Sequence, residues 1–204
     1  MYFKDSKTTQ YFVAVCLCGF DGSELTYVKH GSELTINVKR GLYEPSVIKF
    51  GNRFYLTLRN DDHGYVTSSS DGLMYDEPRR WTFGDGSDLG NYNTQQHWVT
   101  HGDELYLVFT RKAPTTITCF VIEPHCLSLR SIPKSYTSSA TERVLVPERG
   151  ARLGNLWRHP VTPDETWVVA TEWMQTWAES RDARRQQIRA DNSIHIAKIK
   201  WKSD

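Results

Sequence analysis

Short apolar runs separated by polar turns recur along the chain at intervals of about fifty residues. Three segments share a plan of strand, tight turn and strand, and they cover residues 44–59, 96–111 and 156–172. Their turns contain Gly-Asn, Gly-Asp and Pro-Asp pairs, which supply the backbone conformations that tight reversals require. The pattern therefore predicts three β-hairpins with aromatic residues at matching places, namely Tyr55, Tyr106 and Trp167.

The remaining segments predict the outer strands of the same units. A fainter hairpin spans residues 11–30, and further strands are expected at residues 64–70, 78–83, 116–122, 127–132 and 193–201. A polar stretch rich in Gly and Asp, residues 84–91, connects two units. Residues 177–190 are charged and rich in helix formers, which predicts a solvated loop or a short surface helix, with a basic binding arm as the alternative.

Repeated units of four short strands are typical of an all-β fold of the β-propeller class. The chain accounts for about four blades, so a ring of five or six blades would be incomplete. We expect one domain over residues 1–204. An ordinary β-sandwich is the alternative, because its turns also recur at short intervals.

Composition narrows the class of ligand. The 204 residues carry 25 basic and 24 acidic side chains, which argues against nucleic acid or an anionic membrane surface as a partner. Aromatic residues make up 12% of the chain. They suit packing between sheets and also stacking on sugars, so a carbohydrate ligand is a reasonable expectation.

The four cysteines do not form the dense pattern of a disulfide scaffold. Cys16 and Cys18 are two residues apart, so on a strand they share a face, where we expect them to fill the core. A zinc pair is a weaker interpretation, and we expect no metal and no cofactor.

The N-terminal region gives no clear targeting signal. The apolar run over residues 11–20 follows two lysines, as in a signal peptide, but it lacks a clear cleavage site. No run reaches the roughly 18 apolar residues of a membrane-spanning helix. The cellular location stays open, and a truncated N-terminus is one reading.

Charged residues stand at the predicted strand ends. The first residue of an inner strand and the last residue of the next strand should lie at the same end of a hairpin. This pairs Glu44 with Arg59, His97 with Arg111, and Arg158 with Glu172. If these ends meet, they form a pocket suited to an anionic or polyhydroxyl ligand, because Arg offers a planar fork of donors. Each charged residue could instead simply mark the point where a strand ends and the chain becomes exposed to water.

One part of this pattern resembles a known family. Residues 44–73, with a Gly turn between two strands and a third strand after Gly64, look like a blade of the sialidase superfamily. The segment SSDGLMY at residues 69–75 resembles an Asp box with one residue fewer between Asp and Gly. Residues 93–98 and 146–155 resemble segments of uncharacterised bacterial sialidase-like proteins. The resemblance covers residues 41–175.

The resemblance implies a set of roles. Sialidases bind the sugar carboxylate with three arginines and use an Asp acid/base and a Tyr nucleophile that a Glu activates. By motif position, Glu44 resembles the activating Glu and Arg59 the second arginine. The third arginine would be Arg111, Arg152 or Arg158, and Asp62 is a minor candidate for proton transfer.

The sequence departs from that family in two places. No convincing Arg and Asp pair precedes Glu44, and no Tyr follows Asn155 where a nucleophile is expected. The chain is then a fragment or a degenerate member. Three hypotheses stay open: a sialidase-like glycoside hydrolase, a non-catalytic propeller that binds glycan or protein, and a five-bladed furanosidase-type hydrolase with three carboxylates. The oligomeric state is undetermined, with a dimer through exposed strand edges as one alternative.

Overall fold

The structure of the protein is a computed structural model. The structure describes the backbone of residues 1–88, 91–112, 115–123, 128–130, 151–158, 165–172 and 194–200, and the side chains of residues 1–88, 95–109 and 165–167. Every regular element in this part of the chain is a β-strand. The all-β class expected from the sequence is confirmed.

The strands of the described residues form four antiparallel sheets, and the strands of each sheet follow one another in chain order. The first sheet contains β1 (Tyr2–Lys4), β2 (Tyr11–Phe20) and β3 (Leu25–Leu34). The second contains β4 (Tyr43–Phe50), β5 (Arg53–Arg59), β6 (Gly64–Ser69) and β7 (Arg79–Arg80). The third contains β8 (Asn91–His101), β9 (Glu104–Lys112), β10 (Thr115–Glu123) and β11 (Ser128–Arg130), and the fourth β12 (Ala151–Arg158), β13 (Glu165–Glu172) and β14 (Ile194–Lys200).

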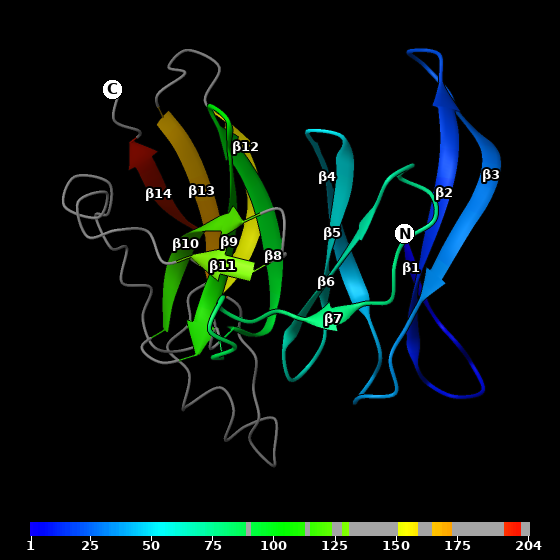
Figure 1. Cartoon of the computed structure of the whole chain (residues 1–204), viewed down its shortest axis with the longest axis horizontal. Coiled ribbons are helices and arrows are strands. Elements are labelled where there is room, and N and C mark those ends of the chain that lie inside the picture. The colour runs from blue at the N-terminus through cyan, green and yellow to red at the C-terminus, as the bar shows by residue number, and fades with distance from the viewer. Residues whose placement is uncertain are drawn as a thin grey trace.

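The sheets follow one another as blades do in a β-propeller. Strand β4 contacts β1 and β8, and β8 in turn contacts β12, so the first strands of successive sheets lie together. Figure 1 shows the second sheet between the first and the third. A meander whose first strand lies beside the first strand of the next meander is the plan of consecutive propeller blades.

The predicted hairpins agree with the observed strands apart from their lengths, and the fainter hairpin over residues 11–30 extends to Leu34. The 44–59 hairpin matches β4 and β5, including its turn at residues 51 and 52. Strands β8 and β12 each begin five residues earlier than predicted, at Asn91 and Ala151. The turn at residues 162–164 and the charged segment 177–190 lie outside the described residues.

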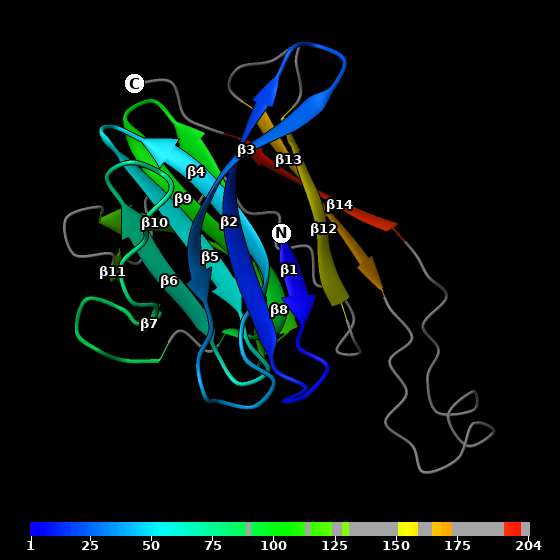
Figure 2. The same cartoon turned by 90° about the vertical axis from the view of Figure 1, so that its right-hand side faces the viewer.

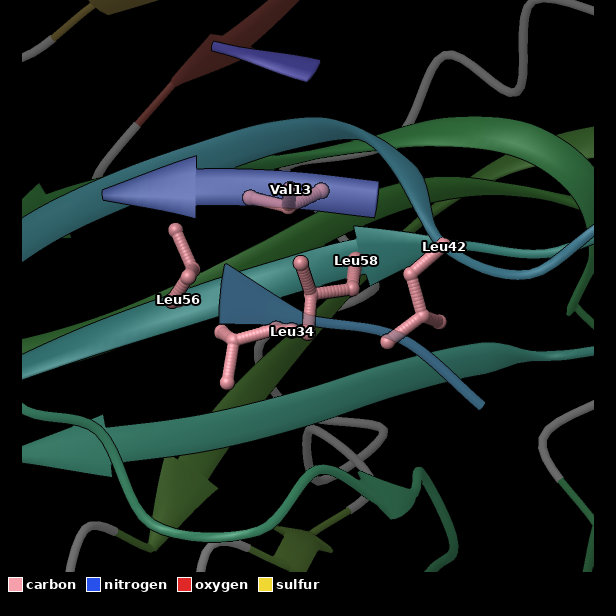
Figure 3. Close-up of a cluster of buried hydrophobic side chains, with 5 residues drawn as sticks. All are labelled: Val13, Leu34, Leu42, Leu56 and Leu58. Carbon is pink, nitrogen blue, oxygen red and sulfur yellow. The ribbon is translucent and has the colours of Figure 1, made fainter. Parts of the chain in front are cut away.

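Aliphatic side chains fill the space between the first and second sheets. Figure 3 shows this cluster, which contains Val13, Leu34, Leu42, Leu56 and Leu58. All five are at most 6% exposed. Burying one such side chain contributes about 1.5–3 kcal/mol, so the cluster holds the two sheets together.

Aromatic side chains take the same place between the second and third sheets. The Trp98 ring centroid lies 6.1 Å from that of Tyr55 and 5.8 Å from that of Trp81. The indole N–H of Trp98 donates a 2.9 Å hydrogen bond to the carbonyl of Ser46. This bond fixes the middle of β8 against β4 and so sets where the neighbouring residues of β8 lie.

The turn after β6 is organised by Asp71. One carboxylate oxygen accepts 2.8 Å hydrogen bonds from the backbone N–H groups of Leu73 and Met74 and from the hydroxyl of Ser69. These bonds, the backbone ones first, lower the pKa of Asp71 to about 2. The carbonyl of Leu73 accepts a 3.0 Å hydrogen bond from the backbone N–H of Ser32 in the first sheet. The turn therefore joins two sheets.

The expected burial of the first two cysteines is wrong. Cys16 and Cys18 are only partly buried, whereas Val13 and Ala14 are 1% and 5% exposed. The reason is that β1 pairs with β2 only as far as Val13. Beyond that point the hairpin of β2 and β3 projects past β4, and Phe20 near its tip is 68% exposed (Figure 2).

Candidate functional site

Glu44 and Arg59 lie together at the open end of the β4–β5 hairpin, which is the end opposite its turn. Arg59 pairs with Tyr43 across the two strands, and its guanidinium forms a salt bridge with the carboxylate of Glu44. The side chain of Arg59 is 4% exposed and that of Glu44 is 19% exposed. The hairpin spacing of the sequence predicted this proximity, and the two side chains indeed make contact.

The backbone at Glu44 adopts an unusual conformation. Its φ is +47°, in the left-handed region that residues other than glycine seldom occupy. The register between β4 and β5 shifts between Tyr43 and Ser46, so Glu44 stands in a β-bulge. Bulges of this kind redirect a side chain. Here the bulge places a carboxylate beside a buried guanidinium, at a strain cost of about 1–3 kcal/mol.

A second charged pair supports the first through an aromatic ring. Arg40 donates two hydrogen bonds to the Asp61 carboxylate, of 2.7 Å and 2.6 Å. The hydroxyl of Tyr43 donates to the same carboxylate at 2.7 Å. The guanidinium carbons of Arg59 and Arg40 lie 5.0 Å and 5.2 Å from the centroid of the Tyr43 ring. Two ion pairs are thus connected through one buried tyrosine.

The pKa values of this network follow from its contacts. The hydrogen bonds from Arg40, with those from Tyr43, lower the pKa of the Asp61 carboxyl, while burial acts against them. Burial, and then the hydrogen bond to Asp61, raises the pKa of the Tyr43 hydroxyl far above its usual range. Tyr43 therefore stays neutral and serves as a hydrogen-bond donor and a surface for the two guanidinium groups.

Asn60 holds the loop that carries Arg40. Its side chain is fully buried, and its amide donates hydrogen bonds of 2.9 Å and 2.7 Å to the carbonyls of Val38 and Gly41. Its side-chain oxygen accepts a 2.9 Å hydrogen bond from the backbone N–H of Asp62. One residue thus ties the end of β5 to the loop before β4, and it fixes Arg40 and Asp61 relative to each other.

Asp62, the candidate for proton transfer, lies further out than its neighbour. Its carboxylate is 41% exposed and lies 3.9 Å from the ammonium group of Lys39, which is itself 57% exposed. The carboxylate that enters the network belongs to Asp61 instead. The sequence analysis gave no role to Arg40 or Tyr43.

His97 of the third sheet lies within the electrostatic reach of Glu44. Burial lowers the pKa of the His97 imidazole, and the negative charge of Glu44 partly opposes this effect. Its Nε2 atom is buried and makes no hydrogen bond within the described part of the chain. Gln96, the residue before His97, is held against β5, because its carbonyl accepts a 3.2 Å hydrogen bond from the hydroxyl of Thr57. The ion pair of Glu44 and Arg59 in the second sheet therefore faces a buried imidazole of the third sheet within electrostatic reach of Glu44.

The expected pairing of His97 with Arg111 is wrong. His97 stands opposite Val108, and Arg111 stands opposite Asn91. The cause is the early start of β8 together with a register irregularity between Asn91 and Gln96. Arg111 thus lies at the open end of the β8–β9 hairpin, one residue further from the turn than Arg59 is in the β4–β5 hairpin. Its side chain lies outside the described ones.

The expected pairing of Arg158 with Glu172 is also wrong. Arg158 pairs with Thr166 near the turn of the β12–β13 hairpin, whereas Glu172 pairs with Ala151 at the open end. Arg152 pairs with Thr171, so it shares that open end with Glu172. The longer β12 explains the difference. The side chains of Arg152, Arg158 and Glu172 lie outside the described ones.

The described residues contain no group of three or more His, Cys, Asp or Glu side chains that could hold a metal ion. They also contain no helix long and apolar enough to cross a membrane.

No protein-family model matches the chain, and no curated protein matches it. Among solved structures, the chain is similar to one described as Bacteroides ovatus Xyloglucan PUL GH43B. The TM-score is 0.44 and the sequence identity is 12%, over 65% of this chain and 24% of that protein. The chain thus corresponds to about a quarter of the length of that protein.

Proposed function

We propose that the protein recognises a carbohydrate, with an acidic or polyhydroxyl sugar bound at the open ends of its sheets. The central residues of the proposed site are Glu44, Arg59 and His97. The observation that carries the proposal is the buried Arg59 salt bridge with Glu44, whose carboxylate is placed by a left-handed backbone. Such a pair gives up hydration and adds strain, costs that are typical of sites kept for function.

Each group has a chemical use in binding a sugar. A guanidinium fork donates to a carboxylate or to vicinal hydroxyls, and the partly exposed Glu44 carboxylate accepts hydrogen bonds from hydroxyls. A neutral His97 imidazole both donates and accepts. Arg111 and Arg152, at the equivalent ends of the next two hairpins, would add donors, and Glu172 a further acceptor.

The network behind the site supports preorganisation. Arg59 rests on the ring of Tyr43, which is held by Asp61 and Arg40. A donor whose position is fixed before binding loses less entropy when the ligand arrives. The same rigidity is what a hydrolase needs at its reacting groups.

The finer proposal is a glycoside hydrolase similar to a sialidase, in which Glu44 transfers a proton or activates a nucleophile. Asp62 is the second proton-transfer candidate in this proposal. The test is hydrolysis of fluorogenic sialosides by the wild type and by Glu44→Gln, Arg59→Lys and Asp62→Asn. Arg53→Lys, at the opposite end of the same hairpin, is the matched control. We expect turnover in the wild type and the control and its loss in Glu44→Gln.

Other outcomes of the same experiment separate the alternatives. Binding of a sialoside by calorimetry without turnover supports a non-catalytic glycan-binding propeller. Turnover of arabinofuranosides or xylosides, with loss in Glu44→Gln, supports a furanosidase-type hydrolase. If no glycoside of either class binds or reacts, the proposed carbohydrate function is wrong.

A further inference from the structure

A second constellation of reactive side chains lies on the first sheet, apart from the proposed sugar site. Cys16 of β2 stands directly opposite His30 of β3, and its Sγ lies 3.9 Å from His30 Nδ1. The other ring nitrogen of His30, Nε2, lies 3.2 Å from Oε1 of Glu33. A thiol, an imidazole and a carboxylate in this order follow the logic of an activated nucleophile.

A β-bulge creates this arrangement. His30 and Glu33 are three residues apart, so on a regular strand they would point to opposite faces. In the structure, Ala14 pairs with Glu33 and Cys16 pairs with His30, so two steps along β2 match three steps along β3. The extra residue returns Glu33 to the face of His30, and Ala14 and Cys16 lie on that same face.

The backbone between His30 and Glu33 is held by the neighbouring sheet. Ser32 donates its backbone N–H to the carbonyl of Leu73 at 3.0 Å, and its hydroxyl accepts from the backbone N–H of Tyr75 at 2.8 Å. A Cβ added at Gly31 would come within 2.3 Å of the Leu73 carbonyl oxygen. Only glycine fits this close approach, and the segment that carries the imidazole and the carboxylate is therefore fixed.

We propose that Cys16 is a reactive thiol that exchanges with small disulfides, with His30 as its base and Glu33 as a positioning residue. A neutral imidazole carries one proton, and Glu33 as the acceptor places that proton on Nε2. Nδ1 then presents its lone pair to the Cys16 thiol. The side chains of His30 and Glu33 are 45% and 52% exposed, and Cys16 is partly exposed, so a small molecule reaches the sulfur.

The chemistry balances without a further reactant. As the Cys16 sulfur bonds to one sulfur of the disulfide, the S–S bond of that reagent breaks and the Cys16 thiol proton passes to His30 Nδ1. The leaving thiolate departs with the electron pair and takes up the proton from His30. One mixed disulfide and one free thiol result. Acyl transfer would also need donors for an oxyanion, whereas attack at sulfur needs only a path and a proton acceptor.

Cys18 provides an internal control. It lies two residues further along the same strand and is also partly exposed, but its partner across the strands is Tyr27, not a base. The probe is dithiodipyridine, followed by the release of pyridinethione, with the modified cysteine identified by mass spectrometry. In a background in which Cys119 and Cys126 are both changed to serine, Cys18→Ser reports the reaction of Cys16, and Cys16→Ser reports that of Cys18.

We expect Cys16 to react at least about tenfold faster than Cys18 at neutral pH, since a positioned base commonly contributes more than this. His30→Gln should bring the Cys16 rate down to the Cys18 rate. Glu33→Gln should lower the Cys16 rate partway and change the pH profile of that rate without moving the thermal midpoint. Glu24→Gln on the same hairpin should leave both the rate and its pH profile unchanged. Equal rates at Cys16 and Cys18, or a Cys16 rate that His30→Gln leaves unchanged, would overturn the proposal.

Discussion

The two ends of the β4–β5 hairpin each carry an arginine beside a carboxylate, but in opposite environments. At the open end, Arg59 is 4% exposed and its partner Glu44 is 19% exposed. At the turn end, Arg53 lies 3.4 Å from Asp76, with exposed fractions of 46% and 74%. The seven residues of β5 therefore connect a buried ion pair to one in water.

The difference shows how burial changes the contribution of an ion pair to the stability of the fold. An exposed pair gains little, because water and salt screen it. A buried pair is costly to assemble and more costly to break, because the remaining charge is left without water or partner. Evolutionary loss of either partner at the open end would therefore be far more damaging than loss at the turn end.

The largest expected effect is that of Arg59→Met. It removes the charge and leaves the largely buried Glu44 carboxylate without its partner, so we expect unfolding free energy to fall by about 3 kcal/mol. Urea unfolding at pH 7 measures it. The double variant Arg59→Met/Glu44→Gln should lose less than Arg59→Met alone, since no orphan charge remains.

Arg53→Met is the matched control for this comparison. The same substitution at the exposed end should change the unfolding free energy by no more than about 0.5 kcal/mol. A loss below about 1 kcal/mol for Arg59→Met, or equal losses at the two ends, would mean that burial does not set the difference.

Asp61→Asn should have an intermediate effect. The variant loses the charge-assisted bonds from Arg40 and weakens the acceptor for Tyr43, but Arg40 is half exposed, so we expect a loss of about 1 kcal/mol at pH 7. Because the pKa of Asp61 is lowered in the folded state, its stabilisation is present above its ordinary value near 3.9 and is lost as pH falls further.

Thermal unfolding of wild type and Asp61→Asn between pH 7 and pH 2.5 checks this. The gap in midpoint should be constant at neutral pH and should narrow in acid. A gap that widens as pH falls would contradict the assigned role of the Arg40 hydrogen bonds.

The smallest effect concerns His97. Burial lowers its pKa in the folded state, so the unfolded chain binds the proton more readily and stability declines as pH falls below about 6.5. His97→Gln should remove this part of the decline between pH 7.5 and pH 5.5 in urea unfolding. If the unfolding free energy of the variant depends on pH as strongly as that of the wild type, His97 does not cause this part of the decline.

Much of the hairpin architecture could be predicted from the sequence. The turn at Gly51 and Asn52 sets the register of β4 and β5, which brings Glu44 near Arg59, and the bulge at Glu44 then directs its carboxylate to the guanidinium. Strand periodicity and turn chemistry are local signals, so they are readable in one sequence.

The irregular positions could not be predicted. Glu44 precedes Pro45, and a residue before proline is normally extended, so nothing in the sequence indicates its left-handed backbone. The irregularity between Asn91 and Gln96, which separates His97 from Arg111, could not be predicted either, because residues 91–96 are almost all polar and show no alternation that a bulge would interrupt. Arg40 was missed because its role depends on Asn60 closing a loop.

The close approach of Gly31 to Leu73 has a consequence for how the molecule opens. The Ser32 amide donates to a carbonyl of the next sheet, so it cannot exchange its hydrogen with solvent unless the two sheets separate there. Because the aliphatic cluster of Figure 3 packs between the same two sheets, we expect the first two sheets to unfold as one cooperative unit. Protection of the Ser32 amide would then report the integrity of both sheets at once.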